Sequence, residues 1–311
     1  MKLLLTGASG FIGRNVLLRA PRDWEIVAVY HRTSDLPAFV AEHGLTHVTP
    51  VACDLVSAGA VRDLAARIGR VDATLYLAAN GDPAASAGRV RWDLELNTVA
   101  VVNVLEQCAV DRMVYMSSGA VYDGLRGSVT PASPVNPLLP YAVSKLASER
   151  YVAFFAERRH ALSSYANVRF FGAYGPYEAP RKITTRWLRA IMAGQRTFSI
   201  RGNGRNLIDF MHVDDAVDAL LRVVGDAGFS GTVDLASGTP LTIDEVVAAM
   251  ARAVGVEIEV RHEGEVPEYI EFLSADTTMR ERFGVAPAVS FADGIRRLHE
   301  FFRHQTAPNR T

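Results

Sequence analysis

The first thirteen residues restrict the fold of this chain more than any other stretch. An apolar run at 3–5 is followed by Gly7, Gly10 and Gly13, and an amphipathic segment begins at Phe11. This order predicts a strand, a tight turn at Gly7, close approach of a pyrophosphate at Gly10 and close helix packing at Gly13. Free N–H groups and the positive dipole at the helix start favour bound phosphate. The stretch therefore predicts a dinucleotide-binding turn that includes Gly7, Ser9, Gly10, Phe11, Ile12 and Gly13.

Strands and helices alternate along the first half of the chain. Short apolar, β-branched runs predict strands at 25–30, 47–52, 73–79, 112–117, 164–171 and 232–236. Apolar residues at helical spacing predict helices at 61–68, 90–109 and 141–157. This alternation predicts an α/β fold with a parallel sheet covered on both faces, and right-handed crossovers make it doubly wound, as in a Rossmann domain. Ligands of such a sheet bind at the carboxyl ends of its strands.

The second half of the chain predicts a smaller part folded over these strand ends. Helices are expected at 181–193, 214–224 and 290–303, and a strand at 207–213. Asp214 is expected to cap one helix, and a capping box from Thr242 to Glu245 opens another. We expect a Rossmann domain of residues 1–170 plus 216–238 and a discontinuous α/β substrate-binding domain of residues 171–215 plus 239–311. The polar tail from Gln305 is expected to be loosely ordered.

Composition argues against several classes of protein. The chain has 311 residues, 49% of them hydrophobic, which is enough for a large core. The net charge is −1 and no basic block occurs, so we expect no nucleic-acid partner. Cys53 and Cys108 belong to no C-x-x-C motif or Cys/His cluster, which predicts free thiols and no metal site. No apolar run reaches about 18 residues, and the glycine turn comes too early for a signal peptide. We therefore expect a cytoplasmic protein that does not enter a membrane.

The residues after the predicted second strand bear on the choice of cofactor. In dinucleotide folds an acidic residue about 20 positions past the glycines binds the ribose 2′-hydroxyl of NAD, whereas an arginine accommodates the 2′-phosphate of NADP. Here that stretch holds His31 and Arg32, followed by Thr33 and Ser34. A cation with hydroxyl donors suits a phosphate dianion, so the sequence favours NADP over NAD. After the third strand, Asp54 is placed to accept a hydrogen bond from the adenine amine.

A second group of residues is suited to acid–base chemistry. Ser118 follows the predicted fifth strand, and Tyr141 and Lys145 lie four residues apart on one face of a helix. The pKa of tyrosine is near 10 in water. A lysine ammonium, with a nicotinamide cation beside it, is expected to lower that pKa. Tyr141 can then exchange a proton with a substrate oxygen while hydride moves at the adjacent carbon, and Ser118 can hold the same oxygen.

Together these motifs resemble those of the extended short-chain dehydrogenase/reductases, and within them the nucleotide-sugar epimerase/dehydratase group. The resemblance covers nearly the whole chain and rests on residues 6–13, Asp54-Leu55, Leu77-Ala78-Ala79, Asn97, 117–122, Tyr141 with Lys145, 169–176 and 209–216. It implies that Ser118, Tyr141 and Lys145 are the catalytic hydroxyl, the acid/base and its lysine. It implies cofactor contacts, beyond those above, from Leu55, Leu77, Ala78, Ala79, Asn97, Tyr141, Lys145 and Phe171.

The resemblance also implies an assembly and a mode of cofactor use. In family members that epimerise or dehydrate, the nicotinamide stays bound while the substrate turns over. Two long helices, here predicted at 90–109 and 141–157, pair across a two-fold axis in this family. We therefore expect a homodimer.

Three positions depart from the family pattern and concern the substrate. Family dehydratases usually carry Asp-Glu after the catalytic hydroxyl, where this chain has Gly119 and Ala120, so 4,6-dehydration is disfavoured. Many epimerases have Asn at the position of Gly172 and Arg at that of Ile208, both for the substrate phosphates. The cations expected to replace these contacts are Arg205 and Arg181, with Lys182 and Arg186 as further candidates.

The sequence therefore predicts an NAD(P)-dependent enzyme acting on a secondary alcohol or ketone of a nucleotide sugar, as a 4-epimerase or a 4-ketoreductase. Ser118, Tyr141, Arg181 and Arg205 are the expected substrate contacts. An alternative is an NADPH-dependent reductase of a non-nucleotide carbonyl, which the missing phosphate contacts favour and the pattern of the second half disfavours. A cofactor-sensing protein without catalysis is a third class, which the intact Ser118, Tyr141 and Lys145 set disfavours.

Overall fold

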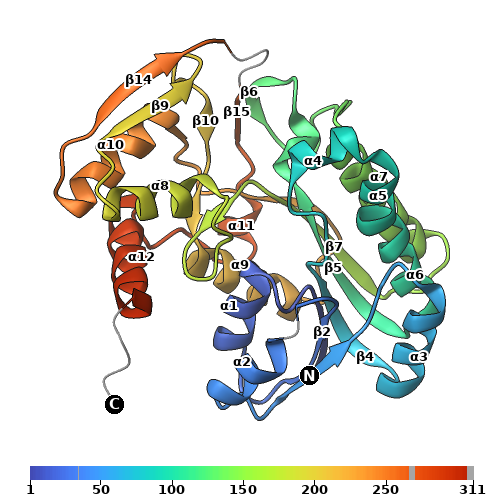
Figure 1. The fold of residues 1–311 in the computed structure, drawn as a ribbon. Coiled ribbons are helices and arrows are strands. Elements are labelled where there is room, and N and C mark those ends of the chain that lie inside the picture. Colours follow the sequence, from blue (N-terminus) through green and yellow to red (C-terminus); the bar gives the residue numbers. More distant parts are fainter. Residues whose placement is uncertain (34, 266–269, 307–311) are drawn as a thin grey trace.

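The computed structural model describes residues 1–33, 35–265 and 270–306. Within them, the centre of the protein is a sheet of seven parallel strands in the order β12-β7-β5-β4-β1-β2-β3 (Figure 1). The strands are β1 (Lys2–Thr6), β2 (Glu25–Tyr30), β3 (Val48–Ala52), β4 (Val71–Tyr76), β5 (Val110–Ser118), β7 (Ser164–Phe170) and β12 (Gly231–Leu235). The chain adds strands in one direction from β1 to β3 and then in the other from β4 onward. The predicted doubly wound Rossmann fold is confirmed.

Helices cover both faces of this sheet. Leu3 and Leu5 pack on one face and Leu4 on the other, because successive side chains of a strand alternate. The first face is covered by α1 (Phe11–Arg19), α2 (Leu36–Glu42) and α9 (Val213–Gly225), and the second by α3 (Ala58–Ile68), α6 (Ala100–Gln107) and α7 (Pro140–Glu157). Figure 1 shows the two helical layers on opposite sides of the strands. Strands buried on both faces are almost continuously apolar, which makes them recognisable in the sequence.

A second hydrophobic core lies outside the main sheet. It includes Trp187, Leu188, Val246, Met250 and Leu298. These residues belong to α8 (Ile183–Met192), α10 (Ile243–Val254) and α12 (Phe291–Thr306). Figure 1 shows these three helices together on the left, away from the strands of the main sheet. The division of the chain into the two discontinuous domains given above stays a prediction.

Two helix starts show how the chain satisfies its first N–H groups. The predicted capping box is present, since Thr242 accepts a hydrogen bond from the Glu245 N–H and Glu245 accepts one from the Thr242 N–H. The prediction that Asp214 caps α9 is wrong. That helix begins at Val213, and the His212 side chain accepts the hydrogen bond from the Asp214 N–H at 3.2 Å. Asp214 lies in the first turn, where a carboxylate still suits the helix dipole.

Four two-stranded sheets complete the strands of the described part. They pair β6 (Arg126–Val129) with β15 (Glu271–Ser274), β8 (Ala173–Tyr174) with β11 (Met211–His212), β9 (Thr197–Arg201) with β14 (Glu259–Glu263), and β10 (Leu207–Ile208) with β13 (Leu241–Thr242). The strand predicted at 207–213 is therefore two short strands with different partners. No strand is predicted from the sequence at β6, because the pairing partner of β6 is far away along the chain and leaves no local pattern.

The helix predicted at 90–109 is interrupted. It consists of α5 (Val90–Leu94), a π-helical turn at Glu95–Val99, and α6. The remaining short helices are α4 (Pro83–Gly88), a 3₁₀ turn at Gly119–Tyr122 and α11 (Thr278–Glu281). Ser34 and residues 307–311 of the predicted tail lie outside the described residues. Among the helices that are described, none has both the length and the apolar character to cross a membrane.

Candidate active site

The predicted strand, turn and helix at the N-terminus are present. Gly7 follows β1 with a left-handed backbone (φ +67°), and α1 begins at Phe11. A Cβ at Gly7 would lie 2.8 Å from the backbone nitrogen of Ala78, and a Cβ at Gly13 would collide with the carbonyl oxygen of Gly7. The turn therefore excludes side chains at both positions. Such a bare backbone at a helix start fits a phosphate group.

A cavity of about 500 Å³ opens beside this turn, at the carboxyl ends of β2 and β3. The predicted cofactor residues on its wall are Gly7, Ser9, Gly10, His31, Arg32, Asp54, Leu55, Leu77, Ala78 and Ala79. The wall residues that directly follow β2 are His31, Arg32 and Thr33, and none of them is acidic. Nε2 of His31 lies 3.9 Å from Oδ2 of Asp54. The geometry fits an adenosine group.

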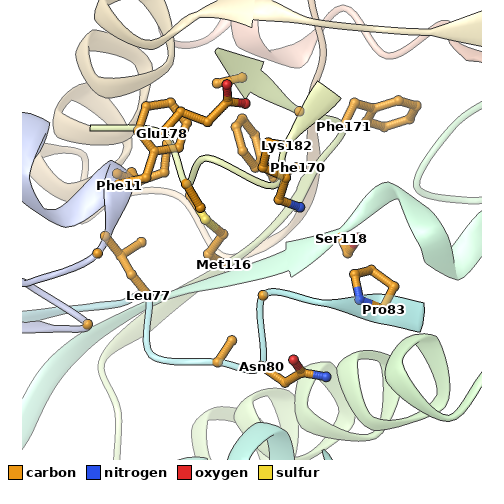
Figure 2. A pocket seen from close by; sticks show the side chains of 18 of the residues that line it. Phe11, Leu77, Asn80, Pro83, Met116, Ser118, Phe170, Phe171, Glu178 and Lys182 are labelled. Carbon is orange, nitrogen blue, oxygen red and sulfur yellow. The ribbon is translucent and has the colours of Figure 1, made fainter. Parts of the chain in front are cut away.

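A larger cavity of about 730 Å³ shares Gly7, Gly10, Leu77 and Ala79 with the first. It runs from the glycine turn to Ser118, Tyr141 and Lys145, and Phe11, Ile12, Gly13 and Phe171 also line it. Figure 2 shows Phe11 and Leu77 at one end, Met116 near the middle and Ser118 beside Pro83 at the other end. Two cavities that share a wall suit a long ligand such as a dinucleotide, with the nicotinamide in the larger one.

Tyr141 and Ser118 meet in the larger cavity. Tyr141 stands in the first turn of α7, and Ser118 ends β5. Burial raises the pKa of Tyr141, the hydrogen bond with Ser118 acts in the opposite direction, and the charges of Asp93 and Asp123 add to the rise. Without a nicotinamide, desolvation of the phenolate outweighs the neighbouring groups, and the lowering of this pKa by Lys145 together with a nicotinamide cation stays a prediction.

Lys145 is a buried cation on the wall of the same cavity. Only 3% of the residue is exposed, and its Nζ donates to the carbonyl oxygen of Met116 at 2.9 Å. The ammonium lies 5.1 Å from the ring centre of Tyr115 and 5.8 Å from that of Tyr141. Burial lowers the pKa of Lys145 to about 8, against the opposing charges of Asp93 and Glu149. The amine is therefore still mainly protonated at neutral pH.

A buried ion pair holds α7 against the sheet below the site. Arg169 of β7 donates to Glu149 at 2.8 Å, and both side chains are 4% exposed. Ser117 donates to the other oxygen of Glu149 at 2.5 Å. Glu149 follows Lys145 by four residues, so this pair fixes the helix one turn beyond the lysine. Sequence reasoning missed this role of Glu149, although the helical spacing places it on the same face as Lys145.

The cations near the opening are only partly those predicted. Arg181, Lys182 and Arg186 line the larger cavity, from the start of α8. Arg181 also reaches the loop after β4, where it donates to the carbonyl oxygen of Gly81 at 3.0 Å. The structure does not place Arg205 on the cavity wall. It is exposed in a turn where its backbone N–H donates to the Asn203 side chain, and its contact with a substrate stays a prediction.

Two further positions from the sequence analysis are Asn97 and Gly172. Asn97 lines neither cavity; its side chain bonds to Asp93 and to the backbone N–H of Asn80, both at 2.8 Å. Asn97 therefore supports the loop after β4, and its contact with a cofactor stays a prediction. Gly172 has φ +156°, and a Cβ there would lie 2.9 Å from the Phe210 ring. A side chain at this position would therefore require the Phe210 ring to move.

In the part of the chain that the structure describes, Glu178 is the only carboxylic acid on the wall of the larger cavity. One of its oxygens accepts hydrogen bonds from the Thr185 N–H at 3.1 Å and the Thr185 hydroxyl at 2.7 Å. Burial raises the pKa of Glu178 to about 7, against these hydrogen bonds. Figure 2 shows Glu178 near Phe11, at the end of the cavity away from Ser118. The sequence carries no signal for it, since it follows a turn and belongs to no motif.

Comparisons with known proteins agree with this geometry. The family described as "NAD dependent epimerase/dehydratase family" matches residues 3–233. A UDP-glucose 4-epimerase of Mycolicibacterium smegmatis is 30% identical, over 98% of this chain and 100% of that protein. A dTDP-glucose 4,6-dehydratase of Streptomyces niveus is 27% identical, over 99% of this chain and 94% of that protein. The solved structure of MoeE5 with UDP-glucose and NAD has a TM-score of 0.85 and 28% identity, covering 99% of this chain and 100% of MoeE5.

Proposed function

This chain belongs to the NAD dependent epimerase/dehydratase family of nucleotide-sugar enzymes, and we propose that it is a nucleotide-sugar 4-epimerase. One observation carries the proposal. Ser118, Tyr141 and the buried Lys145 share a single cavity with the glycine turn, and no carboxylic acid stands beside Ser118 on that wall among the residues described. This arrangement suits proton and hydride exchange at one secondary carbon.

The chain's own groups account for the proton transfer. Tyr141, as phenolate, accepts the proton of the sugar hydroxyl, while the Ser118 hydroxyl donates a hydrogen bond to the same oxygen. The Lys145 ammonium stabilises the phenolate by its charge. A bound nicotinamide dinucleotide supplies the acceptor and donor of hydride. Return of the proton from Tyr141 to the oxygen completes the cycle, and inversion requires room for the sugar to present its other face.

Dehydration requires a further acid. Elimination of a hydroxyl group needs a proton donor near the leaving oxygen. Gly119 and Ala120 follow Ser118, and a Cβ at Gly119 would already lie 3.2 Å from the Phe171 ring. Glu178 is at the other end of the cavity, by the glycine turn. These facts favour epimerisation over dehydration.

The nucleotide part of the substrate is expected at the start of α8. A diphosphate carries charge that a partly dry cavity must compensate. Arg181, Lys182 and Arg186 line that side of the cavity. The positive charge on the wall supports a nucleoside diphosphate over an uncharged carbonyl compound.

We also propose NADP as the preferred cofactor. His31 and Arg32 follow β2 on the wall of the smaller cavity, where an adenosine 2′-phosphate would lie. The MoeE5 structure was obtained with NAD, so the test is a direct comparison of the two dissociation constants. Arg32→Ala is expected to weaken NADP about tenfold or more and to leave NAD nearly unchanged. Tighter binding of NAD to the unaltered protein would sink this part of the proposal.

A homodimer is proposed as the assembly. Five exposed apolar side chains lie on α5 and α7, which pack on one another: Val90, Leu94, Val143, Tyr151 and Phe154. Contiguous apolar residues on a protein surface mark interaction sites. A second copy of the same helices would cover them.

The function is tested with a panel of UDP- and dTDP-hexoses, followed by NMR of the products without added reductant. A 4-epimerase yields a mixture of C4 epimers with no net consumption of cofactor, and the Tyr141→Phe variant yields none. A 4-keto-6-deoxy product would instead show a dehydratase. Stoichiometric consumption of NADPH with a nucleotide-linked 4-keto sugar would show a 4-ketoreductase. Consumption of NADPH only with simple ketones would show a non-nucleotide carbonyl reductase. NADP(H) binding without any turnover would leave a cofactor-sensing protein.

A further inference from the structure

Glu178 is a buried carboxylic acid that the proposed reaction does not use. It lines the larger cavity and is 8% exposed. Its Oε2 accepts hydrogen bonds from both the N–H and the hydroxyl of Thr185, at 3.1 and 2.7 Å. Among the described residues, its Oε1 has no hydrogen-bond or ion-pair partner. A buried polar atom requires a partner, so this oxygen is available to a bound ligand.

The turn that carries Glu178 is fixed to the helix that begins at the glycine turn. Asn15 of α1 is 4% exposed, and its side-chain amide donates to the carbonyl oxygen of Pro176 at 2.9 Å. Tyr177 has a left-handed backbone (φ +69°), which is uncommon for a bulky residue and persists only where the surroundings hold it. Its ring packs edge-on against Phe39 of α2, with 5.5 Å between the ring centres. The carboxyl group of Glu178 therefore keeps a fixed place relative to the phosphate-binding turn.

The position of Glu178 in the cavity restricts the part of the cofactor that it can meet. The pyrophosphate of a dinucleotide belongs at the glycine turn, and the substrate oxygen belongs beside Ser118 and Tyr141 at the other end. Hydride exchange requires the nicotinamide ring next to the carbon that carries this oxygen, so the ring lies between the two ends. Figure 2 shows Glu178 near Phe11, with Met116 nearer the middle of the cavity. Glu178 therefore lies beside the path from the pyrophosphate to the ring.

Charge and shape favour the carboxamide of the ring over the other groups of the cofactor. Phosphate oxygens repel a carboxylate, and the adenosine part is expected in the smaller cavity, whose described wall does not include Glu178. A carboxamide has both an N–H donor and a carbonyl acceptor, so it bonds to an ionised carboxylate and to a neutral carboxylic acid alike. Burial raises the pKa of Glu178 to about 7, so both forms occur near neutral pH. The apolar side chains of Phe11, Leu77 and Met116 on the same wall suit a flat ring.

We propose that Glu178 is a cofactor-binding residue whose free carboxyl oxygen bonds to the carboxamide of the nicotinamide ring and so fixes the ring across the cavity from Tyr141 and Lys145. These two residues reach the cavity from α7, whereas the turn of Glu178 is bound to α1, and the two helices cover opposite faces of the sheet. The inference rests on the proposed function only in that a nicotinamide dinucleotide binds here. It applies alike to an epimerase, a dehydratase and a reductase.

Nicotinic acid adenine dinucleotide tests the contact, because it differs from NAD only in a carboxylate that replaces the carboxamide. Both are titrated calorimetrically against the unaltered protein above neutral pH, where Glu178 is mainly ionised; the 2′-phosphorylated pair is used if NADP binds more tightly than NAD. Two facing carboxylates repel, so the nicotinic acid form is expected to bind about tenfold more weakly or worse. Lys182 and Arg186 on the same cavity wall would attract this form. Equal or tighter binding of it would therefore overturn the proposal.

A matched pair of variants separates the contact from support of α8. Glu178→Gln removes the charge but keeps the shape, and its amide still bonds to Thr185 and to a carboxamide. It is expected to bind NAD nearly as well as the unaltered protein and to lose most of the discrimination against the nicotinic acid form. Thr185→Val removes a hydrogen-bond partner of Glu178 but leaves the carboxylate, so the discrimination is expected to remain. Unchanged discrimination in Glu178→Gln, or equal losses in both variants, would contradict the contact.

A truncated ligand shows which half of the cofactor Glu178 meets. ADP-ribose retains the pyrophosphate and both riboses of NAD but lacks the ring. Glu178→Ala is expected to weaken NAD about fivefold or more and to leave ADP-ribose unchanged. Equal losses for the two ligands would assign Glu178 to the phosphate-binding turn, and a loss confined to UDP would assign it to the substrate; either would overturn the proposal. The titration of the unaltered protein requires no variant to fold. None of these measurements depends on turnover, so failure to process nucleotide sugars would remove the proposed function and leave this result standing.

Discussion

Two opposing influences act on the pKa of Tyr141. Burial raises its pKa, and the hydrogen bond from the Ser118 side favours the phenolate. Lys145 stands one turn further along the same helix with a pKa of about 8. A tyrosine in this setting reacts only when the charge in the cavity compensates the phenolate. The residue therefore depends on its surroundings for its proton chemistry.

Tyr141→Phe tests that role. The ring and its packing are kept while the proton is lost, so turnover is expected to fall about 10²-fold or more. Cofactor affinity is expected to change little. The measurement is kcat on the nucleotide sugar that the substrate panel identifies, with the dissociation constant of the cofactor as control. Activity near that of the unaltered enzyme would show that another group transfers the proton.

Arg186→Ala and Arg205→Ala form a matched pair. Arg186 lines the larger cavity and Arg205 does not, although both are exposed arginines of the same half of the chain. A charge-assisted contact to phosphate contributes roughly 1.5–3 kcal/mol, so Arg186→Ala is expected to weaken nucleoside diphosphate binding about tenfold or more. Arg205→Ala is expected to have little effect. The measurement is calorimetric titration of both variants with a nucleoside diphosphate. A larger loss of affinity in Arg205→Ala than in Arg186→Ala would place the diphosphate away from Arg186.

At the scale of elements, a series of side-chain hydrogen bonds joins the main sheet to β15. Tyr122 donates to Asp234 of β12 at 2.8 Å, and Ser274 of β15 donates to its other oxygen at 2.8 Å. Arg169 donates to the Tyr122 hydroxyl at 2.9 Å. Burial raises the pKa of Asp234 to about 6 in the folded protein, although the donors act in the opposite direction. The link is thus formed around a carboxylate that is costly to ionise.

This gives a prediction about pH. The folded protein holds the Asp234 proton more tightly than the unfolded chain, whose ordinary value is 3.8. Stability contributed by the protonated group is therefore present below about pH 4 and is lost as pH rises through about 6. The difference corresponds to roughly 2–3 kcal/mol. Between about pH 4 and about pH 6, the free energy of unfolding in urea is expected to fall by roughly 2–3 kcal/mol more in the unaltered protein than in the Asp234→Asn variant. Parallel curves for the two proteins would contradict it.

At the scale of the whole molecule, the layer of α5 and α7 leaves apolar side chains uncovered. Phe154 is 48% exposed and Val143 46%, on the face opposite the sheet. Such residues on a helical layer favour association with a second copy, since a symmetric contact uses the same patch twice.

Sedimentation velocity tests this association. A mass of twice 33.9 kDa is expected for the unaltered chain. Phe154→Glu combined with Val143→Glu is expected to give monomers, because buried charges would replace the apolar contact. Ile270→Glu serves as the control, since Ile270 is similarly exposed but lies outside α5 and α7. A monomer in the unaltered protein, or dissociation by the control alone, would rule out this interface.

Local patterns were sufficient for much of the fold. The strands of a parallel sheet are apolar runs buried on both faces, and the glycines at 7, 10 and 13 are required by the turn itself. Tyr141 and Lys145 could be paired from the helical period alone. These features are recognisable because their cause lies within a few neighbouring residues.

The tertiary structure decided what depends on distant contacts. It placed Arg186 on the cavity wall, because this residue lies on α8 beside the cavity. Arg205 lies in a turn that is not part of the cavity lining. The tertiary structure joined Asn97, which holds Asp93, to Ser148 of α7, and it placed Glu178 on the cavity wall; no sequence motif indicates either contact. It also raised the pKa of Tyr141 in the chain without a nicotinamide, since desolvation depends on everything packed around a group. Sequence determines which chemistry is available, and packing determines how each group is charged and what it faces.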